Sequence, residues 1–258
     1  MSARPVVIVT GAATGVGAAS ALWFAARGHD VLINYRASAA PAEAVAAQCR
    51  ALGVDAVAVQ GDVAEDADCR RLAAEAQACW GRIDVLVNSA GTTLFRSMAD
   101  LDALDAADFA RLYQVNTVGP YQMARAVAGA LRAQGGSIVN VSSIAALNGN
   151  GSSYAYAASK GALNTLTLAL ARNLAPDIRV NAVLPGMIEG RWLKEGLGED
   201  VYERVREGFA ANAALGVVAT PEQVAATIGW LAIEATLMTG QLLTVDAGLL
   251  LGRPPRVE

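Results

Sequence analysis

Continuous apolar runs alternate with helix-forming stretches along most of the chain, and this alternation determines the expected fold. Residues 5–10 form a continuous apolar run, as expected for a strand buried on both faces, and further strands are predicted at residues 31–34, 55–60, 84–87, 137–141, 178–183 and 242–245. Stretches of helical composition occupy residues 18–27, 40–52, 65–80, 106–133, 153–175 and 221–235. Short connections join them, so the pattern predicts an α/β fold with a doubly wound parallel sheet of about seven strands and helices on both faces.

Helix ends and one interruption refine this picture. Thr220 before Pro221 has the pattern of a capped helix start, whereas Gly119 and Pro120 predict a kink inside the long helical region. Residues 186–215 contain glycines and charges of both signs and are expected to be loop-like. Such insertions often cover sites, so we expect residues 187–215 to form a substrate loop or lid. No repeat or linker divides the sequence, which predicts one domain over residues 1–258.

The composition supports a large core and narrows the range of partners. Hydrophobic residues make up 54% of the chain and charged residues 17%, and the net charge is −4. An acidic chain without a basic patch gives no sign of a nucleic acid or an anionic membrane as partner. The short apolar run near the N-terminus leads straight into a glycine turn and does not resemble a signal peptide. No run is long enough to span a membrane, so a soluble cytoplasmic protein is expected.

The chain has too few cysteines and histidines for a disulfide framework, a metal site or a histidine-based triad. Cys49, Cys69 and Cys79 are odd in number and lack a C-x-x-C spacing, which argues against a disulfide framework and against a metal knuckle. His29 is the only histidine, and it lies in a predicted turn. We therefore expect neither a metal site nor a histidine-based catalytic triad.

Small and polar residues follow the predicted strands where a ligand would bind. Gly11, Gly15 and Gly17 form a turn between the first strand and the first helix, where backbone N–H groups can hold a phosphate. Asp62, Asn88, Ser142, Ser143, Pro185 and Gly186 follow later strands. Each position alone fits an ordinary tight turn. In an open parallel sheet, ligands bind beyond the carboxyl ends of the strands, so the whole set together predicts a binding site.

Tyr156 and Lys160 are the candidates for chemistry. They are four residues apart in the predicted helix 153–175, which places both side chains on one face, one turn apart. An isolated phenol has a pKa of about 10, and a nearby ammonium favours the phenolate. The pair can therefore serve as an acid/base unit near neutral pH. On an exposed face, however, the same pair would simply be solvated.

Taken together, these motifs resemble the short-chain dehydrogenase/reductase family, in its single-domain form. The chain matches TGxxxGxG at residues 10–17, N-x-A-G at 88–91, an asparagine at Asn116, and a serine, Ser143, thirteen residues before YxxxK. The match continues to TGQLLTVDAG at residues 239–248 and so covers nearly the whole chain. The resemblance implies a Rossmann-like fold that binds a nicotinamide cofactor.

The resemblance also implies roles for individual residues. The catalytic set would be Asn116, Ser143, Tyr156 and Lys160. Tyr156 would transfer the proton, while Lys160 would hold the nicotinamide ribose and lower the Tyr156 pKa. Ser143 would bind the substrate oxygen, and Asn116 would anchor a water linking Lys160 to solvent. The cofactor would contact Tyr156 and Lys160 together with Gly11, Thr14, Val16, Gly17, Tyr35, Arg36, Asp62, Val63, Asn88, Ala90, Gly91, Pro185, Gly186 and Ile188. The substrate would contact Ser143, Leu147, Asn148, Tyr156, Met187 and Trp192.

Two positions depart from the family pattern. Ser89 stands where the family often has a second asparagine, which is a mild change. Gly190 stands where the family often has the threonine of PGxIxT, which removes a hydroxyl expected on the nicotinamide amide.

The implied function is hydride transfer between NADP(H) and a carbonyl or secondary alcohol. Substrates like those of 3-oxoacyl-carrier reductases, sugar dehydrogenases and small-ketone reductases all fit. The alternative is a non-catalytic NADP(H)-binding regulator or scaffold on the same fold. NADP(H) is preferred and NAD(H) is possible, because Tyr35 replaces the acidic residue typical of NAD enzymes and Arg36 follows it. Surplus Ala and Leu on helices 106–133 and 153–175 predict a homo-oligomer, a dimer or tetramer.

Overall fold

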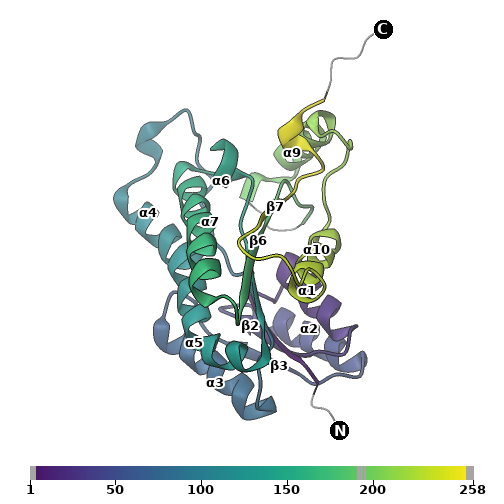
Figure 1. The fold of residues 1–258 in the computed structure, drawn as a ribbon. Coiled ribbons are helices and arrows are strands. Elements are labelled where there is room, and N and C mark those ends of the chain that lie inside the picture. Colours follow the sequence, from purple (N-terminus) through teal and green to yellow (C-terminus); the bar gives the residue numbers. More distant parts are fainter. Residues whose placement is uncertain (1–3, 191–193, 195, 254–258) are drawn as a thin grey trace.

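Seven parallel strands form one sheet in the computed structural model, which describes residues 4–190, 194 and 196–253 (Figure 1). The strand order is β3-β2-β1-β4-β5-β6-β7. The strands are β1 (Val6–Thr10), β2 (Asp30–Tyr35), β3 (Ala56–Gln60), β4 (Val85–Asn88), β5 (Ser137–Val141), β6 (Arg179–Pro185) and β7 (Leu242–Val245). The chain therefore adds strands outward from β1 in one direction, reverses, and continues from β4 in the other. This confirms the doubly wound, Rossmann-like sheet.

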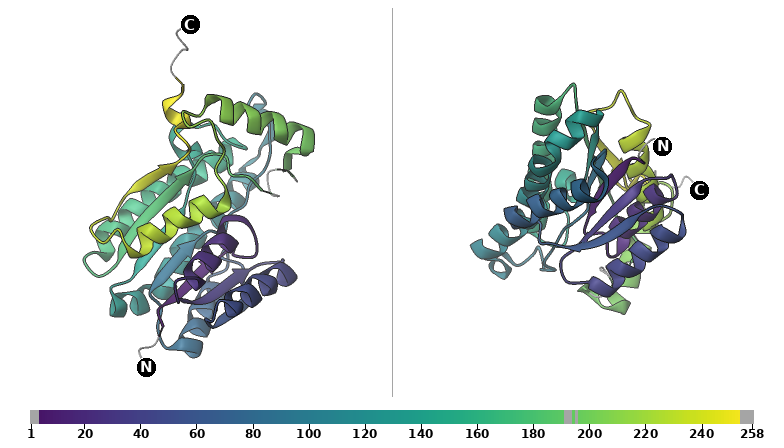
Figure 2. Two further views of the ribbon diagram at one scale, coloured as in Figure 1. Left: turned by 90° about the vertical axis from the view of Figure 1, so that its right-hand side faces the viewer. Right: turned by 90° about the horizontal axis from the view of Figure 1, so that it is seen from below.

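Helices cover both faces of this sheet, as Figures 1 and 2 show. The α-helices are α1 (Gly15–Ala25), α2 (Ala39–Ala51), α3 (Asp66–Trp80), α4 (Ala106–Tyr113), α5 (Gly119–Gln134), α6 (Ala145–Asn148), α7 (Tyr154–Leu174), α9 (Glu199–Asn212) and α10 (Pro221–Ile233). Helices α1, α2 and α10 share one hydrophobic cluster with the sheet, and α3, α5 and α7 share the other. None of the described helices is long and apolar enough to cross a membrane.

Strand β1 shows why the apolar runs are continuous rather than alternating. Val7 and Val9 belong to the cluster under α1, α2 and α10, while Ile8 belongs to the cluster on the opposite face. Successive side chains of a strand point to opposite faces, so a strand covered by helices on both sides must be apolar at every position. All five residues of β1 are buried.

Helices α1 and α10 lie side by side on one face of the sheet (Figure 2). Gly229 allows this close approach, because a Cβ atom there would fall 2.2 Å from Cζ3 of Trp23. The C-terminal end of α10 is held from the sheet by Arg179, whose guanidinium donates to the carbonyls of Leu231 at 2.8 Å and Ala235 at 3.1 Å. Carbonyls at the end of a helix have no partner within the helix, so Arg179 satisfies groups that would otherwise need water.

The structure differs from the predicted elements in two places. The long helical region contains a five-residue π-helix, η2 (Gln114–Val118), between α4 and α5. Pro120 lies in the first turn of α5, directly after the π-helix, and the backbone stays helical through this junction. The prediction that residues 186–215 are loop-like was wrong for Glu199–Asn212, which form the helix α9. This helix buries Tyr202, and Arg206 pairs with Glu203 one turn earlier.

Shorter elements also escaped the sequence pattern. Helix α6 has only four residues. The 3₁₀ turns η1 (Leu101–Ala103) and η3 (Leu249–Leu251) have three each. Segments this short have no room for the period of a helix to repeat, so periodicity cannot reveal them.

Candidate functional site

The glycine turn after β1 and the segment after β4 meet at the carboxyl edge of the sheet, where the strand order reverses. The Thr10 hydroxyl accepts hydrogen bonds from the backbone N–H groups of Ser89 and Ala90, both at 3.1 Å. Gly11 has φ +62°, and a Cβ there would fall 2.7 Å from the Ala90 Cα. Only glycine allows the two segments to come this close.

The turn itself fits a phosphate group. A Cβ on Gly17 would fall 2.4 Å from the Gly11 carbonyl oxygen, so the first turn of α1 folds directly onto the loop. Gly15, with φ +57°, has no heavy atom near its missing Cβ and faces open space. Thr14 precedes α1 and makes no side-chain capping bond, which leaves the first N–H groups of the helix directed outward beside Val16. This open cradle matches the pyrophosphate of a dinucleotide.

Asn34 joins three parts of this cradle, and the sequence analysis missed it. Its Nδ2 donates to the Gly61 carbonyl at 2.9 Å, and its Oδ1 accepts from the Gly11 N–H at 3.3 Å. The side chain is buried and therefore links the ends of β2 and β3 to the glycine turn. A polar residue at the end of an otherwise apolar strand was the only signal in the sequence.

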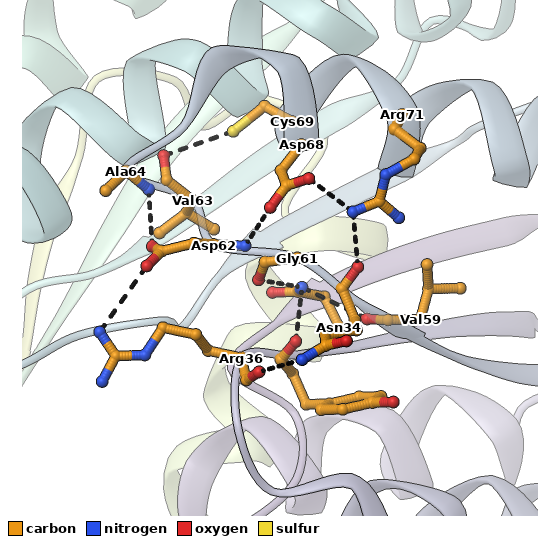
Figure 3. Close-up of polar contacts among 12 residues, drawn as sticks. Asn34, Arg36, Val59, Gly61, Asp62, Val63, Ala64, Asp68, Cys69 and Arg71 are labelled. Carbon is orange, nitrogen blue, oxygen red and sulfur yellow. Dashed lines mark hydrogen bonds and ion pairs between the residues drawn. The ribbon is translucent and has the colours of Figure 1, made fainter.

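Arg36 and Asp62 lie opposite each other across the end of β2 and β3 (Figure 3). Arg36 Nη1 is 3.7 Å from Asp62 Oδ2, and both side chains are partly exposed to solvent. The backbone N–H of Asp62 donates to Asp68 Oδ2 at 2.8 Å, and Asp68 Oδ1 pairs with Arg71. The Asp62 N–H and the Arg71 guanidinium together hold the pKa of Asp68 below its usual range. This network fastens the loop after β3 to α3.

The remaining residues expected at the cofactor divide into lining and supporting positions. Tyr35 and Val63 flank the Arg36–Asp62 pair, and Val63 is buried while Tyr35 is partly buried. Asn88 turns inward instead, because its Nδ2 donates to Asn140 Oδ1 at 2.9 Å within the sheet. Pro185 ends β6, Gly186 follows it, and Ile188 forms a bridge with Ala219.

Tyr156, Lys160 and Ser143 come together where α7 crosses the end of β5. Ser153 caps α7 by accepting the Tyr156 N–H at 3.2 Å. Lys160 Nζ donates to the Val141 carbonyl at 2.8 Å and lies 5.7 Å from the centre of the Tyr156 ring. Ser143 lies near enough to the Tyr156 phenol to act on its pKa.

Burial governs the protonation of this cluster. It lowers the pKa of the Lys160 ammonium from its ordinary value of 10.5 to about 8. It also raises the pKa of the Tyr156 phenol, and Ser143 acts in the opposite direction. The expected lowering of the Tyr156 pKa by Lys160 is therefore absent from this structure. Burial disfavours both charged forms, and the ammonium is directed to the Val141 carbonyl.

Asn116 sits on the π-helix and holds the segment after β4 beside Lys160. Its Oδ1 accepts from the Thr92 N–H at 2.8 Å, while its Nδ2 donates to the Thr92 carbonyl at 2.9 Å and to Ser159 Oγ at 3.0 Å. A Cβ on Gly91 would lie 3.5 Å from Asn116 Oδ1 and 3.8 Å from Lys160 Nζ. Gly91 therefore lies beside both the Asn116 amide and the buried Lys160 ammonium.

The residues predicted to bind the substrate follow the C-terminal ends of β5 and β6. Leu147 and Asn148 are exposed on α6, and Met187 is buried after β6. Trp192 lies outside the described residues. Among those described, no group of three or more His, Cys, Asp and Glu side chains is arranged to hold a metal ion.

The arrangement has the parts needed for proton transfer coupled to transfer of hydride. A phenol, a hydroxyl and an ammonium lie near one another beyond the end of β5, and the phosphate cradle and the Arg36–Asp62 pair continue the same edge of the sheet. A dinucleotide bound along this edge would carry its reactive ring toward Tyr156.

Comparisons with known proteins agree with this reading. A family model described as enoyl-(acyl carrier protein) reductase matches residues 11–250. The chain is 39% identical to ketoacyl reductase 2 of the granaticin polyketide synthase from Streptomyces violaceoruber, over 95% of each chain. It is also 39% identical to an L-rhamnose 1-dehydrogenase (NAD(P)(+)) from Sphingomonas sp., over 94% of this chain and 95% of the relative.

More distant relatives and solved structures give the same answer. A 3-oxoacyl-[acyl-carrier-protein] reductase from Synechocystis sp. is 34% identical over 95% of this chain and 97% of its own. The crystal structure of a short-chain dehydrogenase/reductase from Burkholderia xenovorans is 44% identical, covers 98% of this chain and 100% of its own, and superposes with a TM-score of 0.91. Similarity of this extent establishes common descent, and the chain belongs to the short-chain dehydrogenase/reductase family of oxidoreductases, which transfer hydride between a nicotinamide cofactor and an alcohol or carbonyl group.

Proposed function

We propose that the protein is an NADP(H)-preferring dehydrogenase/reductase in which Tyr156 is the general acid and base. The observation that carries the proposal is the meeting of Tyr156, Ser143 and Lys160 at the mouth of the site. The bound nicotinamide would supply or accept the hydride. In reduction, Ser143 would donate a hydrogen bond to the carbonyl oxygen of the substrate and Tyr156 would deliver its proton to that oxygen.

The protonation states of the free protein suit this direction of transfer. A raised Tyr156 pKa keeps the phenol protonated and ready to donate. Lys160, with a pKa of about 8, would bind the hydroxyls of the nicotinamide ribose and replace the proton on Tyr156 after each turnover. Asn116 would position Thr92 and the open face of Gly91 next to this ammonium.

The non-catalytic alternative has nothing in its favour at this site. A protein that only binds the cofactor needs the glycine turn and the Arg36–Asp62 region. It does not need a buried ammonium beside a phenol and a serine, since a buried charge destabilises the fold. The complete set at Asn116, Ser143, Tyr156 and Lys160 therefore supports turnover.

The substrate is proposed to be a carbonyl or secondary alcohol in an uncharged, mixed pocket. The relatives are named for ketoacyl groups and for L-rhamnose, so keto acyl compounds, sugars and small ketones are the classes to test.

Residues 187–215 are proposed as a lid within one domain. In support of a lid, Gly196 packs so closely on Phe95, in the segment after β4, that a Cβ on Gly196 would fall 2.0 Å from the Phe95 ring.

A reducing, cytoplasmic location is proposed because Cys49, Cys69 and Cys79 are all free thiols.

The preference for NADP(H) rests on the end of β2. Arg36 is partly exposed and pairs with Asp62 at 3.7 Å, an arrangement worth at most about 1 kcal/mol. Separating the pair is therefore easy, and a 2′-phosphate would give the guanidinium a stronger, forked partner. NAD(H) has only a hydroxyl in place of this 2′-phosphate, so it is proposed as a usable but poorer cofactor.

A homo-oligomer, a dimer or tetramer, is proposed from the outer face of α4, α5 and α7. Phe109, Tyr113, Tyr121 and Leu168 are each exposed by 42–48% there. A cavity of about 360 Å³ between α4 and α7 is lined by Phe109, Ala110, Tyr113, Ala155, Ala158 and Ser159. Apolar aromatic surface of this kind is typical of an interface between subunits.

Replacing Tyr156 by Phe should remove the reaction while keeping the cofactor bound. The ring and its packing remain and only the transferable proton is lost, so kcat should fall by roughly 10²-fold or more. Steady-state turnover with a panel of ketones and alcohols measures the loss, and NADPH fluorescence measures binding. Turnover near that of the wild type in this variant would reject Tyr156 as the acid.

The buried ammonium should make stability depend on pH. The pKa of Lys160 is about 8 in the folded protein and 10.5 when unburied, so the unfolded chain binds more protons between these values. The stability that Lys160 contributes should be flat below about pH 8 and rise above it. The Tm of the cofactor-free wild type, relative to Lys160→Met, should therefore rise on the order of 5 °C between about pH 8 and pH 10.

A substitution of Lys194 provides the matched control for the measurement of Tm against pH. A hydrogen bond with Glu199 raises the Lys194 pKa, so any contribution from it would decline rather than rise with pH. A Tm difference between wild type and Lys160→Met that stays constant with pH would contradict the buried-charge account of Lys160.

Arg36→Ala should weaken discrimination between the two cofactors. The wild type should show a higher kcat/KM with NADPH than with NADH. In the variant, the ratio of the two kcat/KM values should fall by about 10- to 100-fold, which corresponds to the free energy of one hydrogen bond to a charged group. Arg70→Ala is the control, because Arg70 is exposed and paired with Asp66 on α3. An NADH preference in the wild type, or an unchanged ratio in Arg36→Ala, would refute this assignment.

Light scattering should give a mass of about two or four times the monomer mass of 26.5 kDa. Phe109→Asp, on the exposed apolar face, should lower that mass because a carboxylate cannot be buried there unpaired. A monomer at micromolar concentration would end the proposal of an oligomer.

A further inference from the structure

Helix α7 is joined to the end of β5 by three consecutive polar contacts, here called the β5–α7 seam. Asn140 Nδ2 donates to Thr167 Oγ1 at 2.9 Å. Lys160 Nζ donates to the Val141 carbonyl at 2.8 Å. Ser142 Oγ donates to Asn164 Oδ1 at 2.7 Å and lies 3.3 Å from the Lys160 carbonyl. Each of the last three positions of this strand segment is thus bonded to a different position on the helix.

All side chains of the seam are buried. Asn140 and Thr167 are fully inaccessible, and Ser142, Lys160 and Asn164 are exposed by only 4–6%. Most contacts between helices and this sheet are apolar, and apolar pairs of the same shape would be as stabilising here. Hydrogen bonds differ from apolar contacts in being directional, so a buried polar pair selects one register of helix on strand.

The seam ends next to the reacting groups. Ser143 follows Ser142 directly, and Tyr156 precedes Lys160 by one helical turn. The backbone on either side of Ser143 is anchored to β6, since the Ser142 N–H donates to the Val183 carbonyl at 2.8 Å and the Ile144 N–H to the Pro185 carbonyl at 3.1 Å. Tyr156 belongs to the helix and has no such anchor on the sheet. Its distance from Ser143 is therefore determined by where α7 sits along β5.

We propose that Ser142 and Asn164 are positioning residues, which set the separation of Ser143 and Tyr156 by locking α7 onto the end of β5. The proposal rests on the function proposed above for Tyr156. Of the seam contacts, the Ser142–Asn164 bond is the one made next to Ser143 by side chains that belong to neither the proposed catalytic set nor the proposed cofactor set. Removing it should change the alignment for reaction and leave the cradle intact.

The test compares Ser142→Ala, Asn164→Leu and the double variant. Leucine has the branched shape of asparagine, so the double variant replaces the polar pair by an apolar one that leaves neither partner buried and unsatisfied. Its Tm should lie within about 4 °C of the wild type, and its Kd for NADPH should change by less than about threefold. Its kcat should fall by about 10- to 100-fold, as displacement of reacting groups by about 1 Å can cost.

Non-additivity gives a second readout. If the two residues act through one bond, the double variant should lose no more kcat than the worse single variant. The control is Thr165→Ala on the same helix, whose exposed hydroxyl bonds only to the Gly161 carbonyl of its own helix at 3.4 Å. This control should keep the kcat, Kd and Tm of the wild type.

Two outcomes would overturn the proposal. A double variant with the kcat of the wild type would show that the bond does not position Tyr156. A kcat that falls only in proportion to a loss of Tm would show a purely structural role. Tyr156→Phe is measured alongside: if it stays active, the proposed function itself fails, whereas if it is inactive and the double variant is not, only the positioning role fails.

Discussion

The contact between the glycine turn and the segment after β4 is the one on which both halves of the site depend. Gly11 lies so close to Ala90 that no side chain fits between them, and the Thr10 hydroxyl binds the two N–H groups that follow β4. One side of this contact carries the phosphate cradle, and the other leads through Thr92 to Asn116 and Lys160. Because both segments leave the sheet at the reversal of strand order, the fold itself brings the proposed binding half and the proposed reacting half together.

On α7, a buried ionisable side chain that suits proton transfer also lowers the stability of the fold. A lysine side chain is inserted between a helix and a strand, where burial lowers its pKa to about 8 and its ammonium donates to the Val141 carbonyl. A hydrophobic residue there would give a more stable cofactor-free protein. Partial burial likewise raises the pKa of the phenol beside it, which therefore resists ionisation. The site therefore keeps one group, the Lys160 ammonium, able to exchange its proton near neutral pH, at a cost that the surrounding apolar clusters offset.

Much of the fold and most of the site were predictable because their signals are local. Continuous apolar runs located all seven strands, and Thr220 and Pro221 marked the start of α10, where the capping box is present. The motif at Tyr156 and Lys160 placed both on one helix. What local patterns could not provide were contacts between distant segments: the Asn34 links, the inward turn of Asn88, and the Arg36–Asp62 pair. The high pKa of Tyr156 was missed for the same reason, since burial is a property of the assembled fold. Helix α9 was missed because its glycine-punctuated, charged surroundings outweighed the local helical signal.

The π-helix before α5 has a consequence for how this sequence can change. A π-helical turn holds one more residue than an α-helical turn, so η2 contains a local surplus in an otherwise regular rod. Deleting one residue from Gln114–Val118 would allow a straight α-helix to form, and local geometry would favour it. Because the surplus residue is contained within the π turn, the helices on either side would keep their relative orientation, and the buried stripe of Met123, Val127 and Leu131 would still face the sheet. The side chains of the π turn itself would move, and Asn116 would lose its bonds to Thr92. A deletion here should therefore spare the packing of α5 and disrupt the placement of Asn116.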